Sequence, residues 1–454
     1  MVRSLRAGYS ATPILTAGDT LFSNDPGAPP FIFYGSAAGL GALDVGKGLA
    51  EVYVAHGFGT RRPPGGSVVS RLLLDTRNAG VLAADYLVEP EDRYVGFDDA
   101  SLAGGRAGFI RPTLLLSEGS TDGAHRGVVA AVDVRNGTVA ELPWLGRDAH
   151  WSTTVVPTTS GKVVAITAAG SYLGETHLYM FLAQSDADFL AGLGDLYVFR
   201  PDARDFLSDP DQGTPALTKG FSIRGEFAAI DRASTGSAAS LEAAAQAAGC
   251  LNFTRLKDLA VDRERLDAFY ITDSGESPPG LFATGSDGLG SGRLYRMALD
   301  PFDPTRVASL EVLLDGAAGD DLYRPSDIDT DEKCVMILED PGERGLHAAR
   351  ILRYDTRTRR LEAVAECAER DRRRRLLPQG VGGAWESSGI LNASDFLGED
   401  SWLLAVQAHT LRAPQSEGWW GESGQLLLLR GGRYPRPNPS PATDGAGRGT
   451  APNQ

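Results

Sequence analysis

Short runs of hydrophobic residues, or of alternating hydrophobic and polar residues, recur along the whole chain and end at Gly, Asp, Asn or Pro. The runs are about four to eight residues long, which is typical of β-strands, and the residues between them are typical of tight turns. Clear examples are residues 69–88, 127–142, 161–167, 194–202, 267–273, 292–300, 333–340, 349–367, 401–410 and 424–432. The pattern predicts an all-β protein.

One motif repeats: a strand of apolar and aromatic residues ends in Asp, a turn follows, and a second strand returns. The motif occurs at residues 196–202, 294–300 and 351–364. Consecutive antiparallel strands of this kind build the blades of a β-propeller. We therefore predict a single propeller domain of about five to seven blades over residues 1–433.

Two stretches depart from the strand pattern. Residues 240–249 are rich in alanine, with Ser240 as a candidate N-cap, Glu242 in the first turn and Gly249 as a terminator. We expect a short helix there, inserted between two blades. Residues 434–454 are rich in Pro, Gly, Ser and Thr and are predicted to form a disordered tail.

Charge and hydropathy exclude several classes of protein. The chain has 454 residues, a net charge of −15 and three cysteines without a paired spacing, which predicts neither a disulfide framework nor a zinc site. A nucleic-acid binder would show a basic surface, and no apolar run approaches the roughly 20 residues of a membrane span. We expect a monomer with no nucleic-acid partner and no membrane span. Residues 1–19 lack the apolar segment of a signal peptide, which leaves the location open.

Acidic residues recur near strand ends in two similar segments. They are Asp258 and Asp273 in residues 256–275, and Asp327, Glu339 and Asp340 in residues 325–342. In a propeller, the strand starts and loops of one face converge on the central channel, where carboxylates from successive blades would crowd together. Crowded carboxylates need protons or a cation, and calcium prefers carboxylate and carbonyl oxygens. The repeated placement favours a metal-filled channel, although each acid alone also suits a strand end or a turn.

A further polar group lies in residues 385–410. Glu386 is near its start, and Gln407 and His409 lie on one face of its last strand, because side chains alternate along a strand. These groups can bind a ligand or orient a carboxylate. Glu118 follows another apolar strand, and Arg255 lies beside an acidic segment, where its planar guanidinium suits either a phosphate or a structural pairing with a carboxylate.

The motifs of other enzyme classes are absent from the sequence. It contains no GxSxG, no P-loop, no HExxH and no GxGxxG between a strand and a helix. A metal-assisted hydrolase is therefore the enzyme class that the residues favour.

A series of short sequences resembles, in the same order, those of the PhoX-type bacterial alkaline phosphatases, particularly the branch from cyanobacteria and marine bacteria. They are residues 7–21, 39–45, 52–60, 70–75, 108–113, 252–258, 324–329, 337–340, 385–391, 406–410 and 424–429. The likeness spans nearly the whole chain. It implies a β-propeller with a metal site in its central channel and hydrolysis of small phosphomonoesters, and family members are usually exported.

The resemblance also implies roles for individual residues. The metal ligands would be Glu118, Asp258, Asp327, Glu339, Asp340 and Glu386. Arg255 and His409 would be the catalytic residues, and the cofactors would be calcium and, as a second candidate, iron.

The same comparison leaves two alternatives open. Gly57, Ser152, Lys257, Asn392 and Ala405 stand where family members carry acids. The first alternative is therefore a non-catalytic propeller that has lost part of the metal cluster. The second is a different propeller hydrolase, a lactonase or a phytase-like esterase, that acts with calcium.

Overall fold

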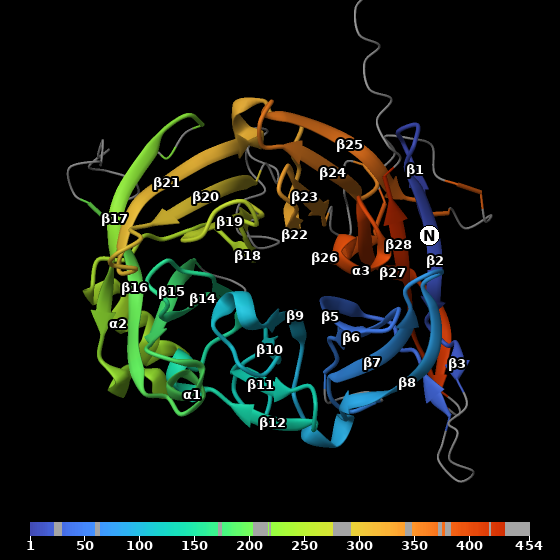
Figure 1. Cartoon of the computed structure of the whole chain (residues 1–454), viewed down its shortest axis with the longest axis horizontal. Helices are drawn as coiled ribbons and strands as arrows, with labels where there is room; N and C mark the ends of the chain where they lie inside the picture. The colour runs from blue at the N-terminus through green and yellow to red at the C-terminus, as the bar shows by residue number, and fades with distance from the viewer. Residues whose placement is uncertain are drawn as a thin grey trace, which may run out of the picture.

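The computed structural model is a ring of β-sheets around a central axis (Figure 1). It describes residues 1–21, 30–59, 64–170, 175–202, 217, 219–275, 292–340, 347–370, 375–376, 383–416 and 419–431. The predicted tail, residues 434–454, lies outside the described residues.

Within the described residues the strands form six blades, each an antiparallel unit that runs from an inner to an outer strand. The first blade contains β5 (Ala37–Gly46), β6 (Leu49–His56), β7 (Val68–Asp75) and β8 (Gly80–Val88). The second contains β9 (Phe97–Ala103), β10 (Thr113–Glu118), β11 (Val129–Asp133) and β12 (Thr138–Glu141). The third contains β13 (His150–Val156), β14 (Val163–Gly170), β15 (Thr176–Ala183) and β16 (Gly194–Pro201). The fourth contains β18 (Leu256–Val261), β19 (Ala268–Asp273), β20 (Arg293–Leu299) and β21 (Arg306–Asp315). The fifth contains β22 (Pro325–Thr330), β23 (Cys334–Glu339), β24 (Arg350–Asp355) and β25 (Arg360–Cys367). The sixth contains β26 (Glu386–Asn392), β27 (Ser401–Ser416) and β28 (Trp419–Arg430).

The first strands of the chain complete the last blades. The strand β2 (Ser10–Thr16) pairs with β28 as the outer strand of the sixth blade, and β1 (Val2–Ser4) pairs with β25 of the fifth. A further strand, β17 (Ser222–Ile230), pairs with both β16 and β21 and joins the third and fourth blades into one sheet. The short strands β3 (Thr20–Leu21) and β4 (Phe31–Ile32) pair with each other.

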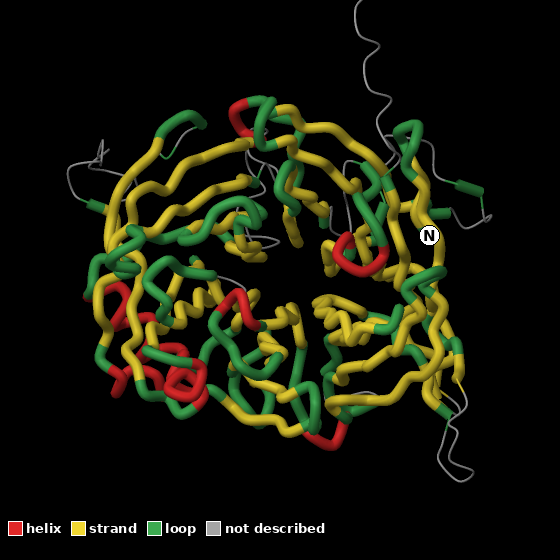
Figure 2. The backbone as a smooth tube through the Cα atoms, in the orientation of Figure 1, coloured by secondary structure: helices red, strands yellow, loops and turns green. Residues whose placement is uncertain are grey.

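Some helices lie around the periphery of the ring, and α3 (Ser394–Leu397) lies nearer its centre (Figure 1 and Figure 2). The described helices are α1 (Asp186–Leu190), α2 (Ala238–Ala247), α3 and the 3₁₀ turns η1 (Pro90–Asp92), η2 (Gly105–Ala107), η3 (Pro143–Leu145), η4 (Arg232–Gly236) and η5 (Gly316–Ala318). The predicted insertion is confirmed as α2, between the third and fourth blades, and Gly249 follows it with a φ of 77°. Its predicted N-cap was wrong: the Ser237 hydroxyl caps the helix by accepting the amide N–H of Ser240.

Hydrophobic side chains fill the space between neighbouring blades. The described core divides into six clusters, and each cluster contains residues of two adjacent blades. The fourth cluster, for example, joins Val52 and Leu72 of the first blade to Leu403 and Leu428 of the sixth. This packing closes the ring and confirms the predicted all-β propeller. None of the helices in the described part of the chain has the length and hydrophobicity that crossing a membrane requires.

Candidate functional site in the central channel

The six inner strands of the described blades, β5, β9, β13, β18, β22 and β26, surround the channel side by side. Each of them contains a β-bulge against the second strand of its blade. The bulges lie between Ala37 and Leu40, Phe97 and Asp99, His150 and Ser152, Leu256 and Leu259, Pro325 and Ile328, and Ser388 and Ile390. A bulge adds one unpaired residue to a strand and redirects its side chain, so all six blades depart from strict alternation at the channel.

Several polar and aromatic residues occupy these bulges. They are Asp98, Trp151, Lys257, Asp258, Ser326 and Asp327. The channel beside them contains a cavity of about 140 Å³, which is lined by residues from all six inner strands. Its lining carboxylates include Asp99, Asp258 and Asp327, so acids from three blades line one shared cavity.

The electrostatics of these three acids show that they are close together. Burial raises the pKa of Asp99 to about 6. Burial and then the charge of Glu386 raise the pKa of Asp327 to about 7. Burial and the charges of Asp99 and Asp327 raise the pKa of Asp258 well above its ordinary value. The group therefore favours protons or a nearby cation at neutral pH.

Glu386 and His409 meet at the start of β26. Nε2 of His409 lies 3.4 Å from the Glu386 carboxylate, and its Nδ1 lies 2.9 Å from the Glu422 carboxylate. Burial opposes the charged imidazolium, but hydrogen bonds to Glu386 and Glu422 outweigh it and raise the pKa of His409 to about 10. His409 is therefore a cation at neutral pH. Burial and the charge of Asp340 raise the pKa of Glu386, which places Asp340 beside this group as well.

Two basic side chains lie against the ring of the same tryptophan, Trp151. The Arg255 guanidinium lies 5.2 Å and the Lys257 ammonium 4.7 Å from the ring centroid of Trp151, within the range of cation–π attraction. Burial raises the pKa of Asp98, and the charges of Lys257 and Arg255 partly oppose that rise. Lys257 likewise lowers the pKa values of Asp327 and Glu386 against the effect of burial. The cations and the acids therefore form one electrostatic unit.

Two of the predicted metal ligands are bound by groups of their own blades. The Glu118 carboxylate accepts backbone N–H groups of Val95, Gly127 and Val128 at 2.8, 2.9 and 3.2 Å. These three bonds tie together loops of its own blade, so Glu118 has the environment of a structural acid.

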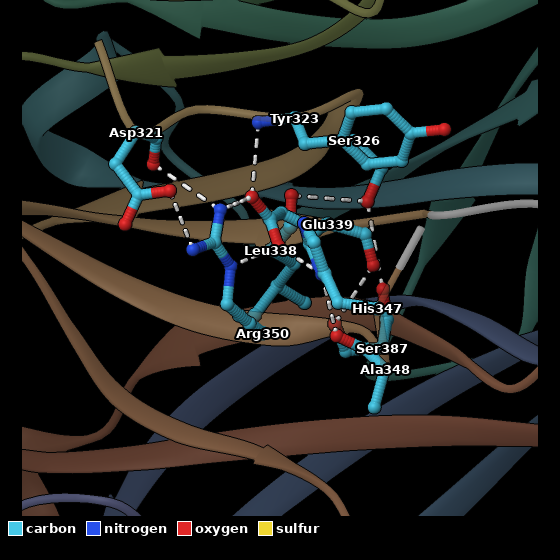
Figure 3. Close-up of polar contacts among 9 residues, drawn as sticks. All are labelled: Asp321, Tyr323, Ser326, Leu338, Glu339, His347, Ala348, Arg350 and Ser387. Carbon is cyan, nitrogen blue, oxygen red and sulfur yellow. Dashed lines mark hydrogen bonds and ion pairs between the residues drawn. The ribbon is translucent and has the colours of Figure 1, made fainter. Parts of the chain in front are cut away.

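Glu339 is the second such residue, and it has no solvent exposure. Its carboxylate accepts Nε and Nη2 of Arg350 at 2.8 and 2.7 Å and the amide N–H of Tyr323 at 3.0 Å. Figure 3 shows the Arg350 guanidinium between Glu339 and Asp321. The structure thus brings Asp258, Asp327, Asp340 and Glu386 to the channel and holds Glu118 and Glu339 within blades.

Asp98, Asp99, Trp151 and Glu422 were not predicted from the sequence as site residues. The first three occupy or adjoin bulges, which hydrophobic alternation cannot reveal. A comparison of the inner strands could have found the first two, because Asp98 and Asp99 occupy the same position in β9 as Lys257 and Asp258 in β18. Glu422 lies on β28, next to the Ser423 that pairs with Ala408, so it contacts His409 across the hairpin, a neighbour that only the strand register reveals.

The metal cluster that the resemblance implies can be tested against these positions. The donors are chemically suitable for calcium. In the described part of the chain, however, no three His, Cys, Asp or Glu side chains are grouped so that they could hold a metal ion. The Lys257 ammonium also stands among the acids that would have to bind one. As placed, the residues do not fit the calcium and iron cluster.

Comparison with family models gave no match, and comparison with curated proteins gave none. Among solved structures the chain is similar to PhoX from Pseudomonas fluorescens, which was solved in complex with vanadate, a transition state analogue. The two chains are 14% identical and superpose with a TM-score of 0.65, and the match covers 94% of this chain and 95% of PhoX. The chain has the propeller fold of PhoX. More distant likenesses are to an α-L-arabinanase from Penicillium chrysogenum (10% identity, TM-score 0.43, 94% of this chain and 98% of that one) and to a sialidase mutant from Trypanosoma rangeli (9%, 0.41, 94% and 59%).

Proposed function

We propose that this chain hydrolyses small phosphomonoesters at the mouth of its central channel, as a PhoX-like phosphatase. One observation carries the proposal: Arg255 and Lys257 converge on Trp151 beside enclosed carboxylates that arise from several blades. Cations next to acid–base groups suit the binding and cleavage of an anion. PhoX, which shares the fold, binds vanadate, a transition state analogue.

Arg255 is the proposed anchor of the phosphate. Its planar guanidinium can donate two parallel hydrogen bonds to phosphate oxygens. Contact with the Trp151 ring fixes the orientation of the guanidinium, and only 5% of Arg255 is exposed, which strengthens its electrostatic attraction to an anion. Lys257 and the imidazolium of His409 both act on Glu386 and add positive charge, which would stabilise the negative charge that grows in the transition state.

Asp327 is the proposed general base. Its pKa of about 7 lies near neutral pH, where a base combines a large ionised fraction with useful proton affinity. It lines the cavity, so a water molecule there could give up a proton to Asp327 as its oxygen bonds to phosphorus, while the P–O ester bond breaks and the alcohol oxygen leaves with the bonding electrons. This assignment uses only side chains of the chain, because the described acids do not form the metal group that the resemblance implies.

Turnover of p-nitrophenyl phosphate by the purified chain tests the proposal. Asp327→Asn is expected to lower kcat by about a hundredfold or more, the usual contribution of a general base. Arg255→Met is expected mainly to raise KM. Asp122→Asn, a change at an exposed loop acid, is the matched control and should leave both constants unchanged. Wild-type turnover no higher than that of Asp327→Asn would refute the proposed activity.

A non-catalytic anion-binding propeller is the second candidate function, and the position of Lys257 favours it. Such a protein would bind vanadate or phosphate at Arg255 and Lys257 without turnover of any ester. Calorimetric titration with vanadate separates the two functions, because only the enzyme combines binding with turnover. The calcium-dependent lactonase or phytase-like esterase stays a prediction, and a substrate panel of lactones and phytate tests it.

A further inference from the structure

The carboxylates of the channel need a positive partner. Asp98, Asp99, Asp258, Asp327 and Glu386 come from four different inner strands, and the charge of each acts on, or is acted on by, at least one of the others. Carboxylates enclosed together cannot all ionise without a cation or protons. A propeller that gathers acids in this way must therefore obtain positive charge, either from solution or from its own side chains.

Lys257 is positioned to provide that charge. It lies in the bulge of β18, where the strand register shifts between Leu256 and Leu259. Its charge acts on Asp98 of β9, Asp327 of β22 and Glu386 of β26. One ammonium group that serves acids on three other inner strands occupies the position of a shared counterion.

The Trp151 ring holds this ammonium at the channel. The distance of 4.7 Å between Nζ and the ring centroid corresponds to a close cation–π contact, which restrains a flexible side chain. Lys257 itself is half-buried, so its charge is only partly screened by water. A tethered cation of this kind is always present, whereas a metal ion must be captured from solution.

We propose that the Lys257 ammonium is the resident counterion of the channel carboxylates and takes the place of a divalent metal ion. The inference deepens the proposed function, on which it rests for the location of the site. The wild-type channel then has little affinity for a divalent cation, because the added positive charge repels one and satisfies the acids. Removal of the lysine charge leaves a hard-oxygen donor set that calcium would enter.

The experiment measures calcium binding and stability rather than activity. Wild type, Lys257→Gln and the control Lys333→Gln, which changes an exposed lysine outside the channel, are titrated with calcium by calorimetry and heated with and without calcium. Calcium should leave the thermal midpoints of wild type and Lys333→Gln unchanged. Lys257→Gln should unfold at a lower temperature without calcium, recover with it, and bind calcium at least about tenfold more tightly than wild type.

A double variant locates any gained site. Asp327→Asn combined with Lys257→Gln should lose the gained calcium affinity, because one donor is removed. Stoichiometric calcium or iron in purified wild-type protein would overturn the inference, even if Lys257→Gln failed to fold. A folded Lys257→Gln that binds calcium no better than wild type would overturn it as well. Neither result depends on turnover, so a failure of the proposed phosphatase activity is recognised separately.

Discussion

Glu339 and Asp340 are consecutive residues with opposite environments. Glu339 ends β23 and turns into the blade, where Arg350 and the Tyr323 amide bind its carboxylate. Asp340 lies at the channel mouth, 3.7 Å from Arg324 and close enough to Glu386 to raise the pKa of that acid. At the scale of single residues, an acid at the end of an apolar strand is thus a structural partner in one case and a site residue in the next.

The buried ion pair of Glu339 gives a testable prediction of stability. Arg350→Met would leave an acid with no solvent exposure without its charged partner, and the free energy of unfolding should fall by about 3–5 kcal/mol. Burial already raises the pKa of Glu339, and Arg350 opposes that rise. The pKa of Glu339 should therefore be still higher in the variant. The loss of unfolding free energy relative to wild type is then largest at neutral pH and shrinks as acidification protonates Glu339.

Urea unfolding at neutral and at mildly acidic pH measures this deficit. Arg357→Met, in the exposed turn between β24 and β25, is the matched control and should change stability by less than about 0.5 kcal/mol. A deficit for Arg350→Met that grows as the pH falls would contradict the assigned role of the pair.

At the scale of strands, the bulges explain what the sequence predicts and what it does not. Alternation and turn residues correctly predicted strands such as β7, β19 and β27, because apolar side chains of those strands pack regularly between blades. Asp258 and Asp327 were selected from the sequence because two similar segments carry them. Asp98 and Trp151 were not, because a bulge changes the direction of one side chain and leaves no periodic signal. The acids around Lys257 lie on three other inner strands, so the spacing of residues along a single strand does not identify them.

The inner strands approach each other so closely that glycine is required at two points. A Cβ atom at Gly39 of β5 would overlap the backbone of Ala100 on β9, and one at Gly389 of β26 would overlap the carbonyl oxygen of Ala38 on β5. Gly39→Ala should therefore push two inner strands apart and lower the free energy of unfolding by about 1–3 kcal/mol. Gly104→Ala, at an extended position that faces open space, is the control. Equal stabilities of the two variants would show that the inner ring is looser than the structure indicates.

At the scale of the whole molecule, residues from both ends of the described chain build the same blade. The strand β2 pairs with β28 from Ser10↔Arg430 to Thr16↔Gln425. The sixth blade thereby joins the last strands to the first, and its hydrophobic contacts with the first blade complete the ring. Ring closure places Glu386 and His409 beside acids from earlier blades, so the candidate site depends on this pairing.

Removal of residues 1–17 tests this dependence. The truncation deletes β1 and β2, exposes the edge of β28 and costs about 1 kcal/mol for each backbone hydrogen bond lost, in addition to the burial of Tyr9 and Leu15. We expect a large fall in the thermal midpoint and exposure of apolar surface to a hydrophobic dye, because an uncovered edge strand also invites aggregation. A chain that ends after residue 433 is the opposite control, since the predicted tail should contribute nothing to stability. If the N-terminal truncation melted at the wild-type temperature, closure of the ring would not depend on β2, and the channel would have to be held by the packing between blades alone.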